Sequence, residues 1–145
     1  MVPPRLTVVT VGARDLAGLR SFYLALGWQA VVDLEDFVAF ETRGAVFTIY
    51  SLERLTADAN TKDAGVGEGL RGVTLAINVD SREEVDETIE AARKAGARVT
   101  AEPKDMDYGG RTSYFMDPED NFWEVAWVPA DSQVAQAVRL AANLE

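Results

Sequence analysis

The sequence predicts an α+β protein built from two βαβββ modules. The chain has 145 residues, 48% of them hydrophobic and 26% charged, so a single domain with a sizeable core is expected over residues 1–145. Two observations predict the repeated module. The order of one strand, one helix and three strands occurs twice, and both predicted helices end at a glycine, Gly27 and Gly96.

The first module spans about residues 5–52. Residues 5–12 are rich in β-branched types and predict a strand. Asp15 is placed as an N-cap, and the apolar residues that follow it up to Gly27 have helical spacing. Three short strands separated by turns complete the module, at residues 28–33, 37–41 and 45–52.

The second module spans about residues 71–128 and repeats this order. Residues 72–80 predict a strand, and Ser81 to Glu84 form a capping box at the start of a helix. That helix has one apolar face and ends at Gly96. The three strands that follow are expected at residues 97–101, 111–116 and 121–128.

Two segments lie outside the modules. Residues 53–70 contain three glycines with Thr, Asp and Asn, which predicts a short helix followed by a mobile linker. A connection of this length can also cover a site. Residues 131–144 carry apolar residues at helical spacing and predict a C-terminal helix.

The last predicted strand contains one carboxylate, Glu124, among apolar residues. Strand alternation places Trp123, Val125 and Trp127 on one face and Glu124 on the other. A charge on a half-buried face needs a partner, a ligand or a wet cavity. A salt-bridged or exposed edge residue is the alternative, but the apolar neighbours of Glu124 favour a functional role.

The turn before this strand predicts the neighbours of Glu124. Pro118 sets the turn's φ, and the residues around it are turn formers. If residues 117–120 form the whole turn, Ser113 faces Glu124 and Arg111 lies diagonal to it. Arg111 then either neutralises Glu124 or binds a ligand.

Composition excludes several functions. The net charge of −10 disfavours nucleic acid and anionic membrane as partners. No stretch is long and apolar enough to span a bilayer, and the N-terminus lacks the pattern of a signal peptide, so a cytoplasmic protein is expected. The absence of histidine and cysteine removes imidazole and thiolate chemistry. A metal site would need oxygen ligands alone.

The hairpin around Pro118 resembles the closing hairpin of the glyoxalase/bleomycin-resistance (vicinal oxygen chelate) superfamily. The family pattern is Tyr-Phe-x-Asp-Pro-x-Gly-Asn-x-x-Glu, and its Glu is the last metal ligand. The family glycine is replaced by Asp120, one of the few residue types that tolerate a positive φ. The resemblance covers about residues 5–128 and implies mixed sheets curving around a concave cleft, with the helices outside. The matching residues are Tyr114, Phe115, Asp117, Pro118, Asn121 and Glu124.

The resemblance also locates the family's four metal ligands. They align with Val8, Thr48, Thr74 and Glu124, so only one position keeps a ligand of the family type. Hydroxyls are weak ligands, and a single carboxylate supplies too little charge for tight divalent binding. We therefore expect no metal and no cofactor, and the metal-dependent glyoxalase and dioxygenase activities are disfavoured.

Strand alternation and the resemblance together predict the lining of a small-molecule cleft. Thr48 and Thr74 also fit plain strand formers, and Tyr50 and Tyr108 fit ordinary rim aromatics. Tyr108, beside two glycines, is expected on a flexible flap. The full candidate set is Thr48, Tyr50, Thr74, Asn78, Tyr108, Arg111, Ser113 and Glu124.

Two functions remain open. The first is metal-free binding or sequestration of an unknown small molecule, and the chain's negative charge favours a cationic one. The second is metal-independent enzyme chemistry, such as a lyase, an isomerase or an enzyme acting on epoxides or carbonyls, with Glu124 as general acid or base. A homodimer is expected in both cases, because family members usually pair.

Overall fold

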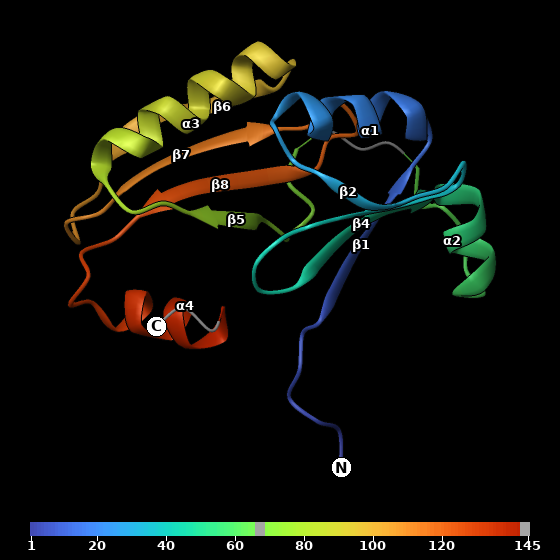
Figure 1. The fold of residues 1–145 in the computed structure, drawn as a ribbon, viewed down its shortest axis with the longest axis horizontal. Helices are drawn as coiled ribbons and strands as arrows, with labels where there is room; N and C mark the ends of the chain where they lie inside the picture. The colour runs from blue at the N-terminus through green and yellow to red at the C-terminus, as the bar shows by residue number, and fades with distance from the viewer. Residues whose placement is uncertain (66–68, 143–145) are drawn as a thin grey trace. The chain divides into compact units, whose positions relative to one another are not determined.

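The computed structural model describes residues 1–65 and 69–142. The chain forms two compact units, residues 1–66 and 67–145. The described residues form eight strands and four helices in an α+β arrangement, and each unit contains one four-stranded mixed sheet (Figure 1). None of the helices in this described part is long and apolar enough to cross a membrane.

The first unit has the predicted βαβββ order. Its sheet has the strand order β1-β4-β3-β2, in which β1 is parallel to β4 and the other pairs are antiparallel. Asp15 caps α1 by accepting a hydrogen bond from the Gly18 amide at 3.0 Å. The elements are β1 (Val8–Ala13), α1 (Leu16–Ala25), β2 (Ala30–Asp33), β3 (Phe37–Phe40), β4 (Val46–Ser51) and α2 (Leu52–Asp58).

The second unit repeats this topology, with the strand order β5-β8-β7-β6 and β5 parallel to β8. The Ser81 hydroxyl accepts a hydrogen bond from the Glu84 amide at 3.2 Å, as the capping box predicts, and α3 ends at Gly96 with φ of 107°. The elements are β5 (Leu75–Asn78), α3 (Arg82–Ala95), β6 (Arg98–Asp105), β7 (Arg111–Met116), β8 (Phe122–Trp127) and α4 (Gln133–Ala141).

Several boundaries differ from those expected. β1 begins at Val8 rather than at residue 5, and β5 is confined to Leu75–Asn78. β6 continues to Asp105 rather than ending at residue 101, because register shifts against β7 let it pass Pro103. Residues 66–68 of the predicted linker and residues 143 and 144 of the predicted C-terminal helix lie outside the described residues.

Each unit has its own core between one helix and one face of its sheet. In the first unit Tyr23 of α1 is fully buried, and its ring centre lies 4.8 Å from that of Phe47. In the second unit α3 packs on β7 and β8, where the rings of Phe115 and Trp123 stack with their centres 6.2 Å apart. The buried residues of α3 are Val85, Ile89 and Ala92, as its apolar face predicts.

The strand pairings show that the two units are equivalent position by position. Phe40 pairs with Phe47 in the first unit, as Phe115 pairs with Trp123 in the second. The next residues along β4 and β8, Thr48 and Glu124, therefore occupy equivalent positions. Their partners on the parallel strands are Thr10 and Ala76.

The hairpin that joins β7 to β8 has a three-residue loop. The Asp117 amide donates to the Asn121 carbonyl at 3.0 Å, so these two residues close the loop. Asp120 supplies the left-handed residue that such loops require, with φ of 64°. The predicted turn, which counted residues 117–120 as the whole loop, is therefore wrong by one residue in register. Tyr114, and not Ser113, pairs with Glu124.

The Asp117 side chain holds this loop together. It is buried, and its Oδ1 accepts hydrogen bonds from the amides of Glu119 and Asn121, both at 2.9 Å. Its Oδ2 accepts a third bond from Asn121 Nδ2 at 2.8 Å. One buried carboxylate thus fixes the loop length that sets the register.

We expect Asp117→Ala to lower the free energy of unfolding by about 3 kcal/mol, since it removes the acceptor of two half-buried amide groups and of the Asn121 side chain. Urea denaturation measures the effect. Asp120→Gly is the matched control, and it should leave stability unchanged or slightly higher because glycine tolerates the positive φ. A loss below about 0.5 kcal/mol for Asp117→Ala would show that the loop does not depend on this carboxylate.

Candidate functional site

Glu124 and Tyr114 form a hydrogen-bonded pair on one face of the second unit's sheet. The Tyr114 hydroxyl donates to Glu124 Oε2, directly across the β7–β8 pairing. Both side chains are half-buried. Their neighbours Trp123 and Val125 are buried on the opposite face, the face that packs against α3. The pair therefore lies on the face turned away from α3.

The partner of the Glu124 carboxylate is a hydroxyl group. Within residues 1–65 and 69–142, no lysine or arginine forms an ion pair with Glu124. The hydrogen bond to Glu124, helped by burial and the carboxylate charge, raises the pKa of Tyr114 to about 12. Tyr114 is thus a neutral donor at physiological pH, and the carboxylate keeps acceptor positions for another partner.

The rest of this face is mostly small or apolar. Ala76 of β5 pairs with Glu124, and Asn78 shares its face two residues on. Arg98 of β6 extends to this side and lies 3.7 Å from the sulfur of Met116. Thr74 is exposed and immediately precedes β5. The other residues of β7 and β8 on this face are Thr112, Met116, Phe122 and Ala126, all of which except Phe122 are buried.

Arg111 and Ser113 lie on the α3 face. Arg111 Nε and Nη2 donate to the two carboxylate oxygens of Asp86 of α3 at 2.9 and 2.8 Å, and Nη1 lies 3.2 Å from Asp105. The hydrogen bond to Arg111 lowers the pKa of Asp86. Ser113 is fully buried and donates to the Ala101 carbonyl at 2.6 Å. The predicted contact of both residues with Glu124 is wrong, because the one-residue register change moves them to the other face.

The candidates of the first unit use their polar groups internally. Thr48 is 2% exposed and shares a hydrogen bond of 2.7 Å with the Thr10 hydroxyl. Tyr50 donates its hydroxyl to Asp58 of α2 at 2.9 Å, and this bond raises the pKa of Tyr50. These bonds favour Thr48 as an ordinary strand residue and Tyr50 as an ordinary rim aromatic over a role of either in binding a ligand.

Tyr108 lies in the loop between β6 and β7 and is 62% exposed. The Met106 amide donates to the Gly110 carbonyl at 2.8 Å, and Arg82 of α3 donates to the Gly109 carbonyl at 3.2 Å. The predicted flap is thus a hydrogen-bonded turn whose aromatic side chain is exposed.

Comparison with known proteins identifies the family. The family model described as the Glyoxalase/Bleomycin resistance protein/Dioxygenase superfamily matches residues 5–125. The chain belongs to this superfamily. No curated protein is significantly similar to it in sequence.

Solved structures support the same fold. A glyoxalase-related enzyme from Fulvimarina pelagi is 26% identical, with a TM-score of 0.78 over 88% of this chain and 90% of its own. A superfamily protein from Nocardioides is 23% identical, with a TM-score of 0.75 over 91% and 88% of the two chains. Lactoylglutathione lyase from Agrobacterium tumefaciens is 21% identical, with a TM-score of 0.65 over 88% and 96%.

The residues at the superfamily's metal positions do not fit a divalent cation. Val8 has no ligand atom, and the Thr48 hydroxyl is buried in a bond to Thr10. Glu124 is the single carboxylate of the four. Among the residues that the structure describes, no three acidic side chains gather where a metal ion could be held. The donor set is too neutral for tight binding.

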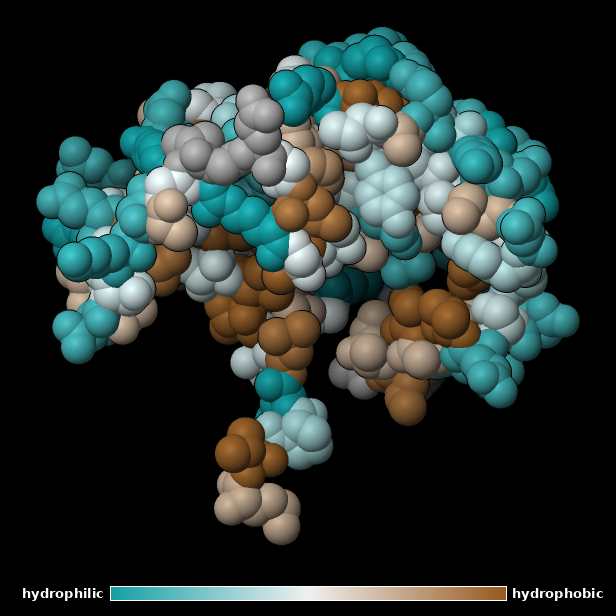
Figure 2. Space-filling view, turned by 180° about the vertical axis from the view of Figure 1, so that it is seen from behind, coloured by the Kyte–Doolittle hydropathy of each residue, from teal (hydrophilic) through white to brown (hydrophobic). Residues whose placement is uncertain are grey.

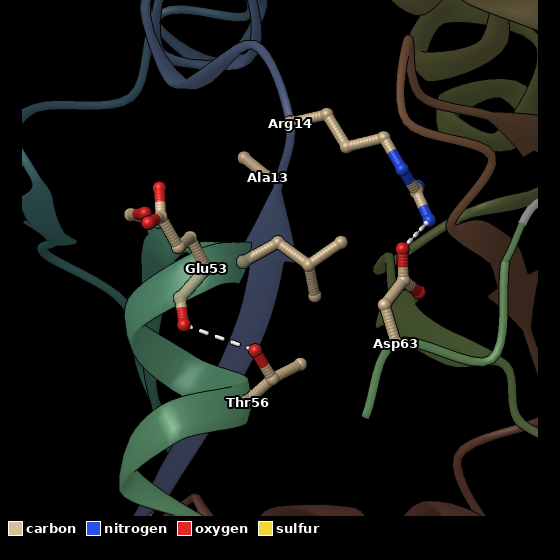
Figure 3. A pocket seen from close by; sticks show the side chains of 7 residues that line it. Ala13, Arg14, Glu53, Thr56 and Asp63 are labelled. Atoms are coloured by element: carbon tan, nitrogen blue, oxygen red, sulfur yellow. Dashed lines mark hydrogen bonds and ion pairs between the residues drawn. The ribbon is translucent and has the colours of Figure 1, made fainter. Parts of the chain in front are cut away.

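Each unit also has a pocket. A pocket of about 340 Å³ in the first unit lies beside α2, where Arg14 and Asp63 point toward each other and pair at 2.6 Å (Figure 3). A pocket of about 420 Å³ in the second unit involves Asn78, Trp127 and α4. Sequence reasoning missed the second pocket and the role of Tyr114. Asp120, which tolerates the positive φ of a three-residue hairpin loop, was the signal from which the pairing of Tyr114 with Glu124 could have been found.

We expect Glu124→Gln to lower the pKa of Tyr114 from about 12 toward the ordinary value of about 10. The folded-state pKa lies above the unfolded value. The stabilisation from this pair is therefore complete below about pH 10 and is lost as pH rises through about 12.

Tyrosinate absorbance during alkaline titration measures this shift. The part of the absorbance change that is missing in Tyr114→Phe comes from Tyr114. Asp58→Asn is the control, because it should shift Tyr50 and leave Tyr114 unchanged. An unaltered Tyr114 titration in Glu124→Gln would contradict the pairing.

Proposed function

We propose that this superfamily member binds a small organic molecule on the sheet face that carries Glu124 and Tyr114, without a divalent metal. The supporting observation is that a neutral hydroxyl, rather than a base, holds the Glu124 carboxylate on a half-buried face. A ligand that donates hydrogen bonds or carries positive charge would satisfy the remaining acceptor positions.

The surroundings favour a ligand with a cationic or donor group and an apolar body. Ala76 and Phe122 offer apolar contact on the same face. The net charge of −10 adds a long-range attraction for cations. Arg98, at the β6 side, would disfavour a second positive group there. The ligand therefore carries a single positive or donor group near Glu124.

A second candidate is metal-independent catalysis, which the Tyr114–Glu124 hydrogen bond favours. The carboxylate can take a proton from a substrate, and the phenol can donate a hydrogen bond to a developing oxyanion. An enzyme of this kind would lose turnover of its carbonyl or epoxide substrate in both Glu124→Gln and Tyr114→Phe. A binding protein would show no turnover before or after either substitution.

A binding site that contains Glu124 should select ligands by their charge. In calorimetric titrations against matched cationic, neutral and anionic compounds, the cations should bind most tightly. Glu124→Gln should weaken them by about tenfold or more while changing the free energy of unfolding by less than about 1 kcal/mol. Glu41→Gln, at an exposed position of the first unit, is the matched control for the loss of one charge. A large loss of stability with unchanged affinity would make Glu124 a structural residue instead.

Metal addition gives an independent test. A metal that binds only the folded state raises the melting temperature by mass action. Because Val8, Thr48 and Thr74 replace three ligands, we expect micromolar Ni, Zn or Mn to leave the melting temperature unchanged. A rise of several degrees that Glu124→Ala abolishes would overturn the metal-free proposal.

We also propose a homodimer, which rests on exposed apolar side chains. Apolar side chains gather on α4 (Figure 2), where Val134 and Leu140 are exposed. Trp123 does not contribute, because it is buried in the core. Light scattering at micromolar concentration should give twice the 15.8 kDa chain mass. The monomer mass would contradict the proposal.

A further inference from the structure

We propose a second binding site in the second unit, for a small zwitterion such as a free amino acid with an apolar side chain. The site is the pocket of about 420 Å³ between α4 and the ends of β5 and β8, a volume suited to a small organic molecule. It is lined by Asn78, Val79, Asp80, Trp127, Val128, Ala130, Ala135, Val138 and Arg139.

The pocket has a fixed frame. The Val79 amide donates to the Ala126 carbonyl at 2.9 Å, which holds the end of β5 against β8. Ser132 caps α4 by accepting from the Ala135 amide at 3.1 Å, and its own amide donates to Pro129 at 2.9 Å. These bonds fix where α4 begins after β8. Ala135, 9% exposed, is the buried contact of α4.

One wall of the pocket is an aromatic ring held in place. The Arg82 guanidinium lies 5.0 Å from the centre of the Trp127 ring, in a cation–π contact. Arg82 is itself held by an ion pair with Asp105 and a 3.2 Å bond to the Gly109 carbonyl. Trp127 thus offers a preorganised apolar surface, which Val138 extends from α4.

The polar groups of the pocket are an acid, a base and an amide. Asp80, Arg139 and Asn78 all line it, and over residues 1–65 and 69–142 none of their side chains has a hydrogen-bond or ion-pair partner. The carboxylate and the guanidinium share one pocket without pairing. A molecule with a carboxylate for Arg139 and an ammonium for Asp80 would complete both, with its apolar side chain against Trp127.

This site is separate from the one proposed for Glu124. Neither Glu124 nor Tyr114 lines the pocket, and Asn78 is the single residue shared with the candidate set drawn from the sequence. The two sites also differ in charge, because the pocket beside α4 contains both Asp80 and Arg139, whereas the first site is built on the Glu124 carboxylate. Loss of either site leaves the proposal for the other intact.

Isothermal titration calorimetry of the full chain with L-phenylalanine tests the proposal. Saturable binding is expected. In the Glu124→Gln variant, whose first site no longer favours a cation, binding should be about tenfold or more weaker for hydrocinnamate, which lacks the ammonium, and for phenylalaninamide, which lacks the carboxylate. Arg139→Gln should weaken the binding of phenylalanine about tenfold, so that phenylalanine and phenylalaninamide bind with equal affinity. Asp80→Asn should also weaken the binding of phenylalanine about tenfold, so that phenylalanine and hydrocinnamate bind with equal affinity.

Matched controls separate this effect from net charge. Arg43→Gln and Asp107→Asn change the same charges at exposed positions outside the pocket and should leave binding unchanged. Glu124→Gln should also leave phenylalanine binding unchanged, which distinguishes this site from the first. Absence of saturable binding at about 10 mM, or equal affinities in the wild type and both pocket variants, would overturn the proposal.

Discussion

The length of one hairpin loop determines the chemistry on the second unit's sheet. Side chains alternate across a strand, so a change of one residue in register exchanges everything that faces a given partner. The left-handed conformation of Asp120 and the hydrogen bonds that the Asp117 side chain accepts from Glu119 and Asn121 set a loop of three residues. The result is that Tyr114 meets Glu124, whereas Arg111 reaches Asp86 of α3.

The two units differ at equivalent positions. Thr48 and Glu124 occupy equivalent positions in β4 and β8. Thr48 is buried and shares a hydrogen bond with the Thr10 hydroxyl, whereas Glu124 is a half-buried carboxylate that accepts from Tyr114. A superfamily metal centre draws ligands from both kinds of position, and the neutral residues here cannot supply them. The half-buried carboxylate at these equivalent positions is thus found in the second unit.

Much of the fold was predictable from local chemistry. The N-caps at Asp15 and Ser81 and the glycine that ends α3 follow from short patterns, and the repeat of element order gave the two-unit topology. The neighbours of Glu124 were not predictable in the same way, because they depend on one backbone torsion in the loop. The pocket beside α4 depends on tertiary packing between α4 and the strand ends, which strand and helix periodicity does not encode.

The site depends on a direct contact between Tyr114 and Glu124. A double-mutant cycle on the free energy of unfolding, with Tyr114→Phe and Glu124→Gln, tests it most directly. We expect a coupling energy of about 1 kcal/mol for this pair, and additive effects for Ser113→Ala combined with Glu124→Gln. Additivity for Tyr114 together with coupling for Ser113 would contradict the register and the site built on it.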